Sequence, residues 1–231
     1  MEEKVKSHIG REWYNVLKDQ IPSLASIFAS LRHKKAQSKI IYPDVNNVFR
    51  AFKLTPYDKV RVVILGQDPY HYEANGIAVA DGLAFSSGSD SYQPPSLKNI
   101  LSEVENNCYD GFSIELSDVT SLDKWAEQGV FLINTALTVE KYSPGSHSLL
   151  WKEFTTNVIK RLNEREEMIF FLLWGNHAKR YDKLINREKH VVLEAGHPSP
   201  LNTKVPFKGC EHFAFIWDIL NTKKEELIEW V

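Results

Sequence analysis

Residues 62–71 read VVILGQDPYH, and this stretch decides the fold. Its first four residues form an apolar run that is too short for a helix and rich in β-branched side chains, as is typical of a buried strand. The polar letters GQDPYH follow directly, so a carboxylate and an imidazole stand where the strand ends. The stretch therefore predicts a strand that carries polar groups to one edge of a sheet.

Three more apolar runs have the same form, each followed within a few residues by a polar motif. They are residues 130–133, 169–173 and 191–193, and the motifs are NT, WGNH and GHPSP. Helical patterns at 97–104, 122–128, 154–162 and 212–220 separate most of them. Buried runs that alternate with helices predict an α/β fold: a three-layer α/β/α sandwich around a central, mostly parallel four-stranded sheet.

The ends of these predicted strands hold residues that suit chemistry. In open α/β sheets, ligands bind beyond the carboxyl ends of the strands. Those ends hold an acid, an amide and several imidazoles, namely Asp68, His71, Asn134, His177 and His197. Such a set at one edge favours hydrolysis or proton transfer over a purely structural role.

Length and charge limit the remaining possibilities. A chain of 231 residues fits one α/β domain, and we expect a single domain over 1–231 with a helical segment, 1–40, packed on it. The basic stretch 32–39 reads as a solvated surface. The net charge of −2 does not favour nucleic-acid binding by the overall field, so any DNA site must be a local patch.

The two cysteines, Cys108 and Cys210, have no Cys or His partner at metal-ligand spacing, and one pair does not imply a disulfide framework. The N-terminus lacks the apolar core of a signal peptide, and no apolar run is long enough to span a bilayer. We therefore expect a cytoplasmic protein that holds no metal and binds no membrane. A nuclear or viral setting stays open.

Five motifs together indicate a family. They are ILGQDPYH at 64–71, GLAFS at 82–86, PPS at 94–96, LINTALTV at 132–139 and HPSPL at 197–201. In this order they resemble the family 1 uracil-DNA glycosylases, and the match extends from Tyr42 onward. The resemblance implies a monomeric, cofactor-free DNA N-glycosylase of base excision repair. Such an enzyme flips uracil out of DNA, hydrolyses its N-glycosidic bond and leaves an abasic site, without lyase activity.

The resemblance also assigns roles in catalysis. Asp68 matches the carboxylate that orients the attacking water, although an Asp before Pro is also an ordinary turn residue. His197 matches a neutral imidazole that donates a hydrogen bond to uracil O2 as negative charge builds there. The alternative for a lone His is a structural role.

Four residues match the uracil pocket of the family. Asn134 matches the amide that donates to O4 and accepts from N3–H, a pattern that cytosine cannot satisfy. Phe85 is expected to stack on the base, and Tyr70 to exclude the methyl group of thymine. Gln67 is expected to contact the base through its main chain.

The resemblance implies uracil-containing single- or double-stranded DNA as the partner, and DNA-mimicking inhibitor proteins as possible ligands of the same face. Leu201 matches the wedge that enters the base stack. The expected DNA contacts are His71, Pro94, Pro95, Ser96, His147, Ser199, Leu201 and Asn202, whereas His177 is expected to be structural or peripheral.

The chain departs from the family pattern in two places. Residues 72–81, YEANGIAVAD, form a longer loop, which we expect to be a packed, strand-like turn outside the water site. The chain also differs from the family pattern in the segment around the HPSPL motif, at Gly196, at Asn202 and in the letters VPFKG at 205–209.

Two other functions stay open: a DNA-binding or protein-docking module without activity, and a metal-dependent hydrolase. Loss of Asp68, Asn134 or His197 would mark the inactive module, and all three are present.

Overall fold

The central sheet of the computed structural model, which describes residues 2–108, 116 and 118–230, has four parallel strands. They are β2 (Val62–Gly66), β5 (Val130–Asn134), β7 (Phe170–Trp174) and β8 (Val191–Ala195), in the order β5-β2-β7-β8. The first three strands are fully buried, which explains their continuous apolar runs. The predicted four-stranded α/β sheet is confirmed.

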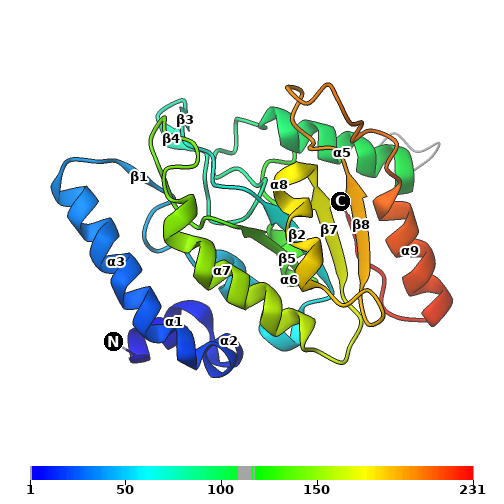
Figure 1. Ribbon diagram of the computed structural model, residues 1–231. Coiled ribbons are helices and arrows are strands. Elements are labelled where there is room, and N and C mark those ends of the chain that lie inside the picture. Colours follow the sequence, from blue (N-terminus) through cyan, green and yellow to red (C-terminus); the bar gives the residue numbers. More distant parts are fainter. Residues whose placement is uncertain (1, 109–115, 117, 231) are drawn as a thin grey trace.

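Helices lie on both sides of this sheet (Figure 1). Helices α5 (Pro95–Cys108) and α9 (His212–Lys223) pack against each other on one side. Helices α7 (Ser148–Asn163) and α8 (Gly175–Lys179) lie on the other side. Shorter helical segments complete the layers: α4 (Arg50–Leu54), α6 (Asp123–Glu127), η2 (Tyr57–Lys59) and η3 (Asp182–Leu184). The three layers are those that the alternating sequence pattern predicts.

The N-terminal segment contains α1 (Glu2–Ile9), α2 (Arg11–Val16), η1 (Lys18–Gln20) and α3 (Ile21–Ala36). A helical segment is expected over 1–40, and the structure has three α-helices there. The break between α1 and α2 falls at Gly10, whose φ of +81° interrupts the helical path.

The same segment packs firmly on the sheet. The ring of Trp13 is fully buried and stacks on Phe131 of β5, with 4.8 Å between the ring centroids. The indole nitrogen of Trp13 donates to the carbonyl of Thr55 at 2.8 Å.

The basic stretch 32–39 is exposed over most of its length, as the sequence predicts, and two of its lysines also form ion pairs. Lys34 and Lys39 pair with Glu140 at 2.7 and 3.4 Å. Glu140 belongs to β6 (Val139–Glu140), which pairs with β1 (Ile41–Tyr42).

The longer loop at 72–81 is a β-hairpin, β3 (Glu73–Ala74) and β4 (Ile77–Ala78). Asn75 and Gly76 form its two-residue turn with φ values of 52° and 77°, the conformation that Asn-Gly favours. Its tip is exposed.

Both acids of this loop are held by partners within the protein. Asp81 is buried, and it accepts hydrogen bonds from Arg50 at 2.8 Å and from Ser86 at 2.6 Å. Glu73 forms an ion pair with Lys141 at 2.9 Å.

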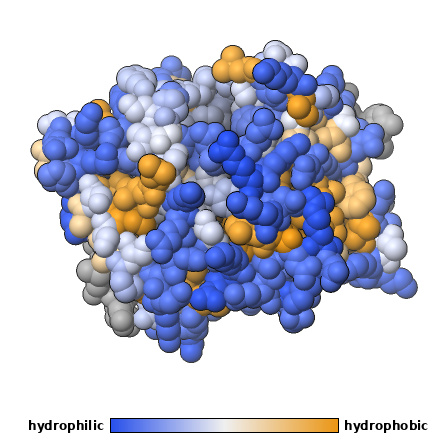
Figure 2. Space-filling view, viewed as in Figure 1, coloured by the Kyte–Doolittle hydropathy of each residue, from blue (hydrophilic) through white to orange (hydrophobic). Residues whose placement is uncertain are grey.

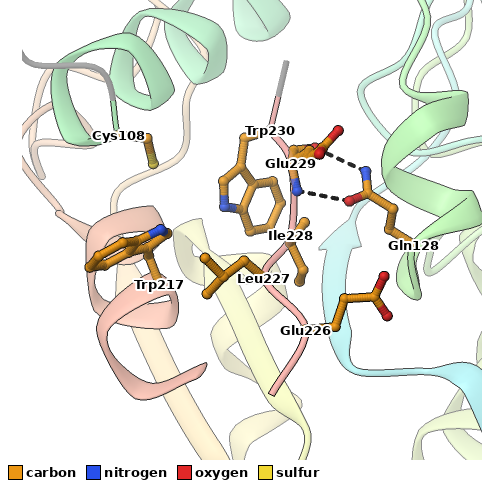
Figure 3. A pocket seen from close by; sticks show the side chains of 8 residues that line it. All are labelled: Cys108, Gln128, Trp217, Glu226, Leu227, Ile228, Glu229 and Trp230. Carbon is orange, nitrogen blue, oxygen red and sulfur yellow. Dashed lines mark hydrogen bonds between the residues drawn. The ribbon is translucent and has the colours of Figure 1, made fainter. Parts of the chain in front are cut away.

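Figure 2 shows a largely hydrophilic surface with separate hydrophobic patches. Within the described ranges, no helix combines the length and the apolar character needed to cross a membrane. A cavity of about 630 Å³ lies between the end of α5, α9 and the C-terminal segment (Figure 3). Gln128 lines it and pairs with the backbone of Glu229 at 2.7 and 2.9 Å. None of the predicted site residues lines this cavity.

Candidate active site

The carboxyl ends of the four strands bring the predicted residues to one edge of the sheet. Asp68 follows β2, Asn134 ends β5, His177 lies in α8 directly after β7, and His197 follows β8. Strand β2 pairs with β5 on one side and with β7 on the other, so the chain changes direction across the sheet at this point. Such a switch point is where α/β sheets bind ligands.

Asp68 is fixed by a loop that precedes α7. The backbone N–H of Gly145 donates to Oδ2 of Asp68 at 2.5 Å. The neighbouring carbonyl of Gln67 accepts hydrogen bonds from Thr135 Oγ1 at 2.7 Å and from Ala136 N at 2.9 Å. The side chain of Gln67 is exposed, whereas its carbonyl is held beside Asp68 by these two hydrogen bonds.

The hydrogen bonds of His197 identify its tautomer. The N–H of Ser199 donates to Nδ1 of His197 at 3.0 Å, so Nδ1 carries no proton. The neutral ring therefore holds its proton on Nε2, which has no hydrogen-bond partner among the described residues. Burial, together with the nearby His177, lowers the pKa of His197 and favours this neutral form.

A glycine makes room for the His197 ring. Gly175 has a φ of +83°, and a Cβ atom at this position would lie 2.9 Å from Cβ of His197. Only a residue without a side chain takes this conformation readily and leaves that space free.

Asn134 is placed by a second close approach. Its Cα pairs in register with Gly66 on the neighbouring strand, and the residue is only 7% exposed. A Cβ atom at Gly66 would lie 2.1 Å from Oδ1 of Asn134. Gly66 therefore provides the space into which the Asn134 amide turns.

The predicted stacking residue, Phe85, is half-buried beside His197. Their ring centroids are 6.0 Å apart, and the ring of Trp174 is 5.7 Å away from Phe85 on the buried side. Phe85 has a φ of 68°, an unusual conformation for an aromatic residue and one that is often found at functional sites. Tyr70 donates a long hydrogen bond of 3.4 Å to the carbonyl of Phe85, and burial raises the pKa of Tyr70.

His177 is closer to the site than the sequence indicates. Thr135 gives its only proton to the carbonyl of Gln67, so its oxygen accepts from Nε2 of His177 at 2.7 Å. Burial and Arg180 lower the pKa of His177, while Asp68 acts in the opposite direction. The WGNH spacing places a histidine at this edge, but nothing in the sequence reveals the shared threonine.

Leu201 is 90% exposed at the tip of the loop after His197. Three hydrogen bonds hold this loop: Oγ of Ser199 accepts from Leu201 N at 3.2 Å, and Asn202 Nδ2 donates to the carbonyls of His197 and Val205 at 3.0 and 2.7 Å. The side-chain nitrogen of Asn202 is thus engaged within its own loop.

The departures from the family pattern at Gly196 and Asn202 have one structural cause. A Cβ atom at Gly196 would lie 1.9 Å from the carbonyl oxygen of Val205 and 2.7 Å from Nδ2 of Asn202. The glycine therefore permits the hydrogen bonds by which Asn202 closes the loop.

The PPS motif begins helix α5. Pro94 is buried, Pro95 is exposed and Ser96 is half-buried at the first turn, where free backbone N–H groups favour phosphate. Asn99 of the same helix donates to the carbonyl of Pro198 at 2.6 Å, which connects this turn to the His197 loop.

His71 and His147, two predicted DNA contacts, differ in their exposure. His71 is half-buried, and its Nδ1 is enclosed without a partner among the described residues. His147 is only 1% exposed and lies with Nδ1 2.8 Å from Thr138 Oγ1. The prediction that His147 contacts DNA is corrected by this burial, because its ring supports the loop from inside.

Within the part of the chain that the structure describes, no group of three or more His, Cys, Asp and Glu side chains is placed to hold a metal ion.

Comparisons with known proteins agree with this geometry. The family model described as the uracil DNA glycosylase superfamily matches residues 52–221. A uracil-DNA glycosylase of Fusobacterium nucleatum is 40% identical over 97% of this chain and 96% of its own length.

Two solved structures share the fold. The crystal structure of mimivirus uracil-DNA glycosylase has a TM-score of 0.85 at 27% identity and covers 95% of this chain and 86% of its own. A mimivirus UNG variant in complex with UGI has a TM-score of 0.86 at 26% identity, with 97% and 90% covered. The chain therefore belongs to the uracil DNA glycosylase superfamily and is a DNA N-glycosylase that acts on uracil in DNA.

Proposed function

We propose that Asp68 and His197 carry out the hydrolysis from opposite sides of the scissile bond. Asp68 stands after β2, and His197 stands after β8, which lies two strands away at the same edge of the sheet. The observation that carries this proposal is the hydrogen bond from Ser199 N to Nδ1 of His197 at 3.0 Å. This bond leaves Nε2–H available to a bound base.

The two groups match the charges that develop in the reaction. As the N-glycosidic bond breaks, positive charge grows on the deoxyribose and negative charge on uracil. The carboxylate of Asp68 stabilises the sugar and orients water toward C1′. The Nε2–H of His197 donates to uracil O2 and stabilises the departing anion without transferring its proton, because a neutral imidazole is a weak acid.

Three residues select uracil in this proposal. The Asn134 amide donates to O4 and accepts from N3–H, while Phe85 stacks on the face of the base. Cytosine leaves the buried amide groups of Asn134 unpaired, at a typical cost of about 1–3 kcal/mol each. Tyr70, held next to Phe85 by its 3.4 Å hydrogen bond, stands against C5 of uracil and excludes the thymine methyl group.

We further propose that DNA is gripped by two rigid turns. These are the start of α5 at Pro94, Pro95 and Ser96, and the loop that holds Ser199 and presents Leu201 as the wedge. His71 adds a contact beside the catalytic motif. Asn202 contributes by holding the Leu201 loop closed, since its amide nitrogen serves that loop.

The same surface is the proposed docking site of DNA-mimicking inhibitor proteins, a proposal supported by the complex of mimivirus UNG with UGI. We propose a single domain, because one cluster of buried residues extends from Ile9 to Trp230. We also propose that the protein acts as a monomer, as the family resemblance implies. The free thiols Cys108 and Cys210 support a reducing compartment such as the cytoplasm.

A product assay tests the proposal. Oligonucleotides that contain one uracil, cytosine or thymine are incubated with the enzyme in EDTA, and free base and strand breaks are measured separately. We expect release of uracil alone and an intact abasic strand that breaks only after alkali. Asp68→Asn protein, purified in the same way, excludes a contaminating glycosylase. Loss of activity in EDTA, or release of cytosine, would contradict the proposed site.

A further inference from the structure

Tyr142 is an exposed aromatic residue for which the proposed reaction has no use. It lies between β6 and α7, and it is 68% exposed. Its φ of 59° is in the left-handed region, which glycine occupies far more readily than an aromatic residue. Among the described non-glycine residues with positive φ, the two aromatic ones are Tyr142 and Phe85. Phe85 belongs to the proposed base pocket. Tyr142 shares its unusual conformation and is therefore a candidate for a second contact with the substrate.

The backbone around Tyr142 is attached to the catalytic motif. Tyr142 N donates to the carbonyl of His71 at 2.8 Å, and Gly145 N donates to Asp68 at 2.5 Å. Lys141 N donates to the carbonyl of Ile40 at 2.9 Å. The segment is therefore held in place on the Asp68 side of the pocket, and the Tyr142 ring is presented beside it.

The charge in this region is already neutralised. Lys141 pairs with Glu73 at 2.9 Å, and its Nζ also lies 5.3 Å from the centroid of the Tyr142 ring. Tyr42 donates a second hydrogen bond to Glu73. Because Lys141, the cation beside the ring, is engaged with Glu73, this part of the rim offers DNA an aromatic surface rather than a phosphate contact.

The sheet order places Tyr142 and Leu201 on different sides of the pocket. Tyr142 is attached to the motif after β2 and follows β5 and β6 in the chain, whereas Leu201 follows β8 at the other end of the order β5-β2-β7-β8. A DNA strand with its uracil in the pocket has neighbouring bases on both sides, and each has lost a stacking partner. Leu201 fills the gap in the stack, and an aromatic ring suits an unstacked neighbour.

We propose that Tyr142 stacks on the nucleobase next to the flipped uracil in the same strand, and so binds the substrate on the side away from Leu201. This inference rests on the proposed site. Stacking on an aromatic side chain is tolerant of sequence and adds about tenfold to affinity for each base. It also adds no salt dependence, because no phosphate is neutralised.

The test uses single-stranded oligonucleotides that contain a 2′-fluorinated deoxyuridine, which resists cleavage. In one set, an abasic spacer replaces the base on the 5′ or the 3′ side of the uracil. Dissociation constants are measured for wild type, Tyr142→Gly and Tyr142→Phe. Glycine removes the ring while suiting the backbone conformation, and phenylalanine keeps the ring. Lys224→Gly, at the C-terminal end of α9 with a φ of 56°, is the matched control for relief of the same strain.

We expect wild type to lose about tenfold in affinity when one particular neighbour is replaced by the spacer. Tyr142→Gly should bind the intact strand about tenfold more weakly than wild type does. Its affinity should not fall further when the spacer replaces that neighbour, and Tyr142→Phe should behave as wild type. The slope of log affinity against log salt should be the same for wild type and Tyr142→Gly. The proposal would be overturned if the spacer lowered the affinity of wild type and of Tyr142→Gly by the same factor. It would also be overturned if Tyr142→Gly bound the intact strand as tightly as wild type does. Uracil release by wild type from ordinary deoxyuridine, measured in parallel, shows separately whether the proposed function holds.

Discussion

The proposed base pocket and the proposed DNA-facing rim are built in different ways. In the pocket, Asn134 and His197 stand at strand ends, and each occupies space that a glycine leaves free, Gly66 for the first and Gly175 for the second. At the rim, Leu201 stands almost fully exposed in a loop. The positions of the proposed pocket residues are thus set by the sheet and tolerate little change, whereas the proposed rim would act through single side chains exposed on turns.

This difference predicts a ranking of mutational effects. Substitutions in the pocket should lower the rate of bond cleavage on every substrate, since they act on the reacting groups. Substitutions at the rim should affect binding or flipping, and to an extent that depends on the form of the DNA.

The largest effect is expected for Asp68→Asn. The amide keeps the size of the side chain but removes the charge that the proposed mechanism places opposite the sugar cation, so the single-turnover rate should fall on the order of 10²–10⁴-fold. Affinity for DNA that resists cleavage should change little, because the carboxylate acts mainly in the transition state. Asp218→Asn, an exposed acid on α9, is the control. Weaker binding with an unchanged single-turnover rate would show that Asp68 holds DNA instead.

A smaller effect is expected for Gly66→Ala. The new Cβ atom would lie 2.1 Å from Oδ1 of Asn134 and 3.0 Å from Cβ of Ala84, so the amide must move away from the position in which we propose that it binds uracil. Displacement of a positioning group by about 1 Å costs on the order of 10²-fold in kcat/KM. Single- and double-stranded substrates should lose equally, and a thermal melt checks that the variant is folded. Wild-type kcat/KM in a folded Gly66→Ala protein would mean that Asn134 does not read the base.

The smallest of the three effects is expected for Leu201→Ala, and it should depend on the substrate. We expect paired uracil to be excised about tenfold more slowly, because the gap left in the stack is no longer filled. Uracil in single strands should be excised at nearly the wild-type rate. Val205→Ala, an exposed apolar residue of the same loop, is the control. An equal loss on both substrates would place Leu201 with the pocket rather than the rim.

Sequence and structure agree best where short-range pattern and topology coincide. Buried apolar runs followed by polar motifs predict both the parallel sheet and the edge that carries Asp68, Asn134 and His197. Pattern does not reveal contacts between distant segments. The Gly145 N–H on Asp68, the threonine shared by Gln67 and His177, and the joint role of Gly196 and Asn202 all depend on such contacts.

The burial of His147 also depends on contacts between separate segments. Its ring lies against Thr138 and near Glu140, whose Oε1 is 3.6 Å from Nε2 of His147.

The N-terminal helices show another limit of prediction from the sequence. Their apolar spacing predicts a packed surface, but the position of the break between α1 and α2 depends on a single glycine, Gly10.

The most direct test of the proposed mechanism is the protonation state of His197. Nitrogen-detected NMR of the enzyme with labelled imidazoles, free and with bound uracil, reports the proton on each ring nitrogen across a pH titration. We predict a neutral ring at pH 7 in both states, with Nδ1 unprotonated and the proton on Nε2, and a pKa below the ordinary value of 6.5 because burial disfavours the charged form. Protonation, and with it loss of the neutral donor, should therefore occur only as the pH falls below 6.5. A ring protonated on both nitrogens at pH 7 with uracil bound, or a neutral ring with its proton on Nδ1, would contradict the mechanism.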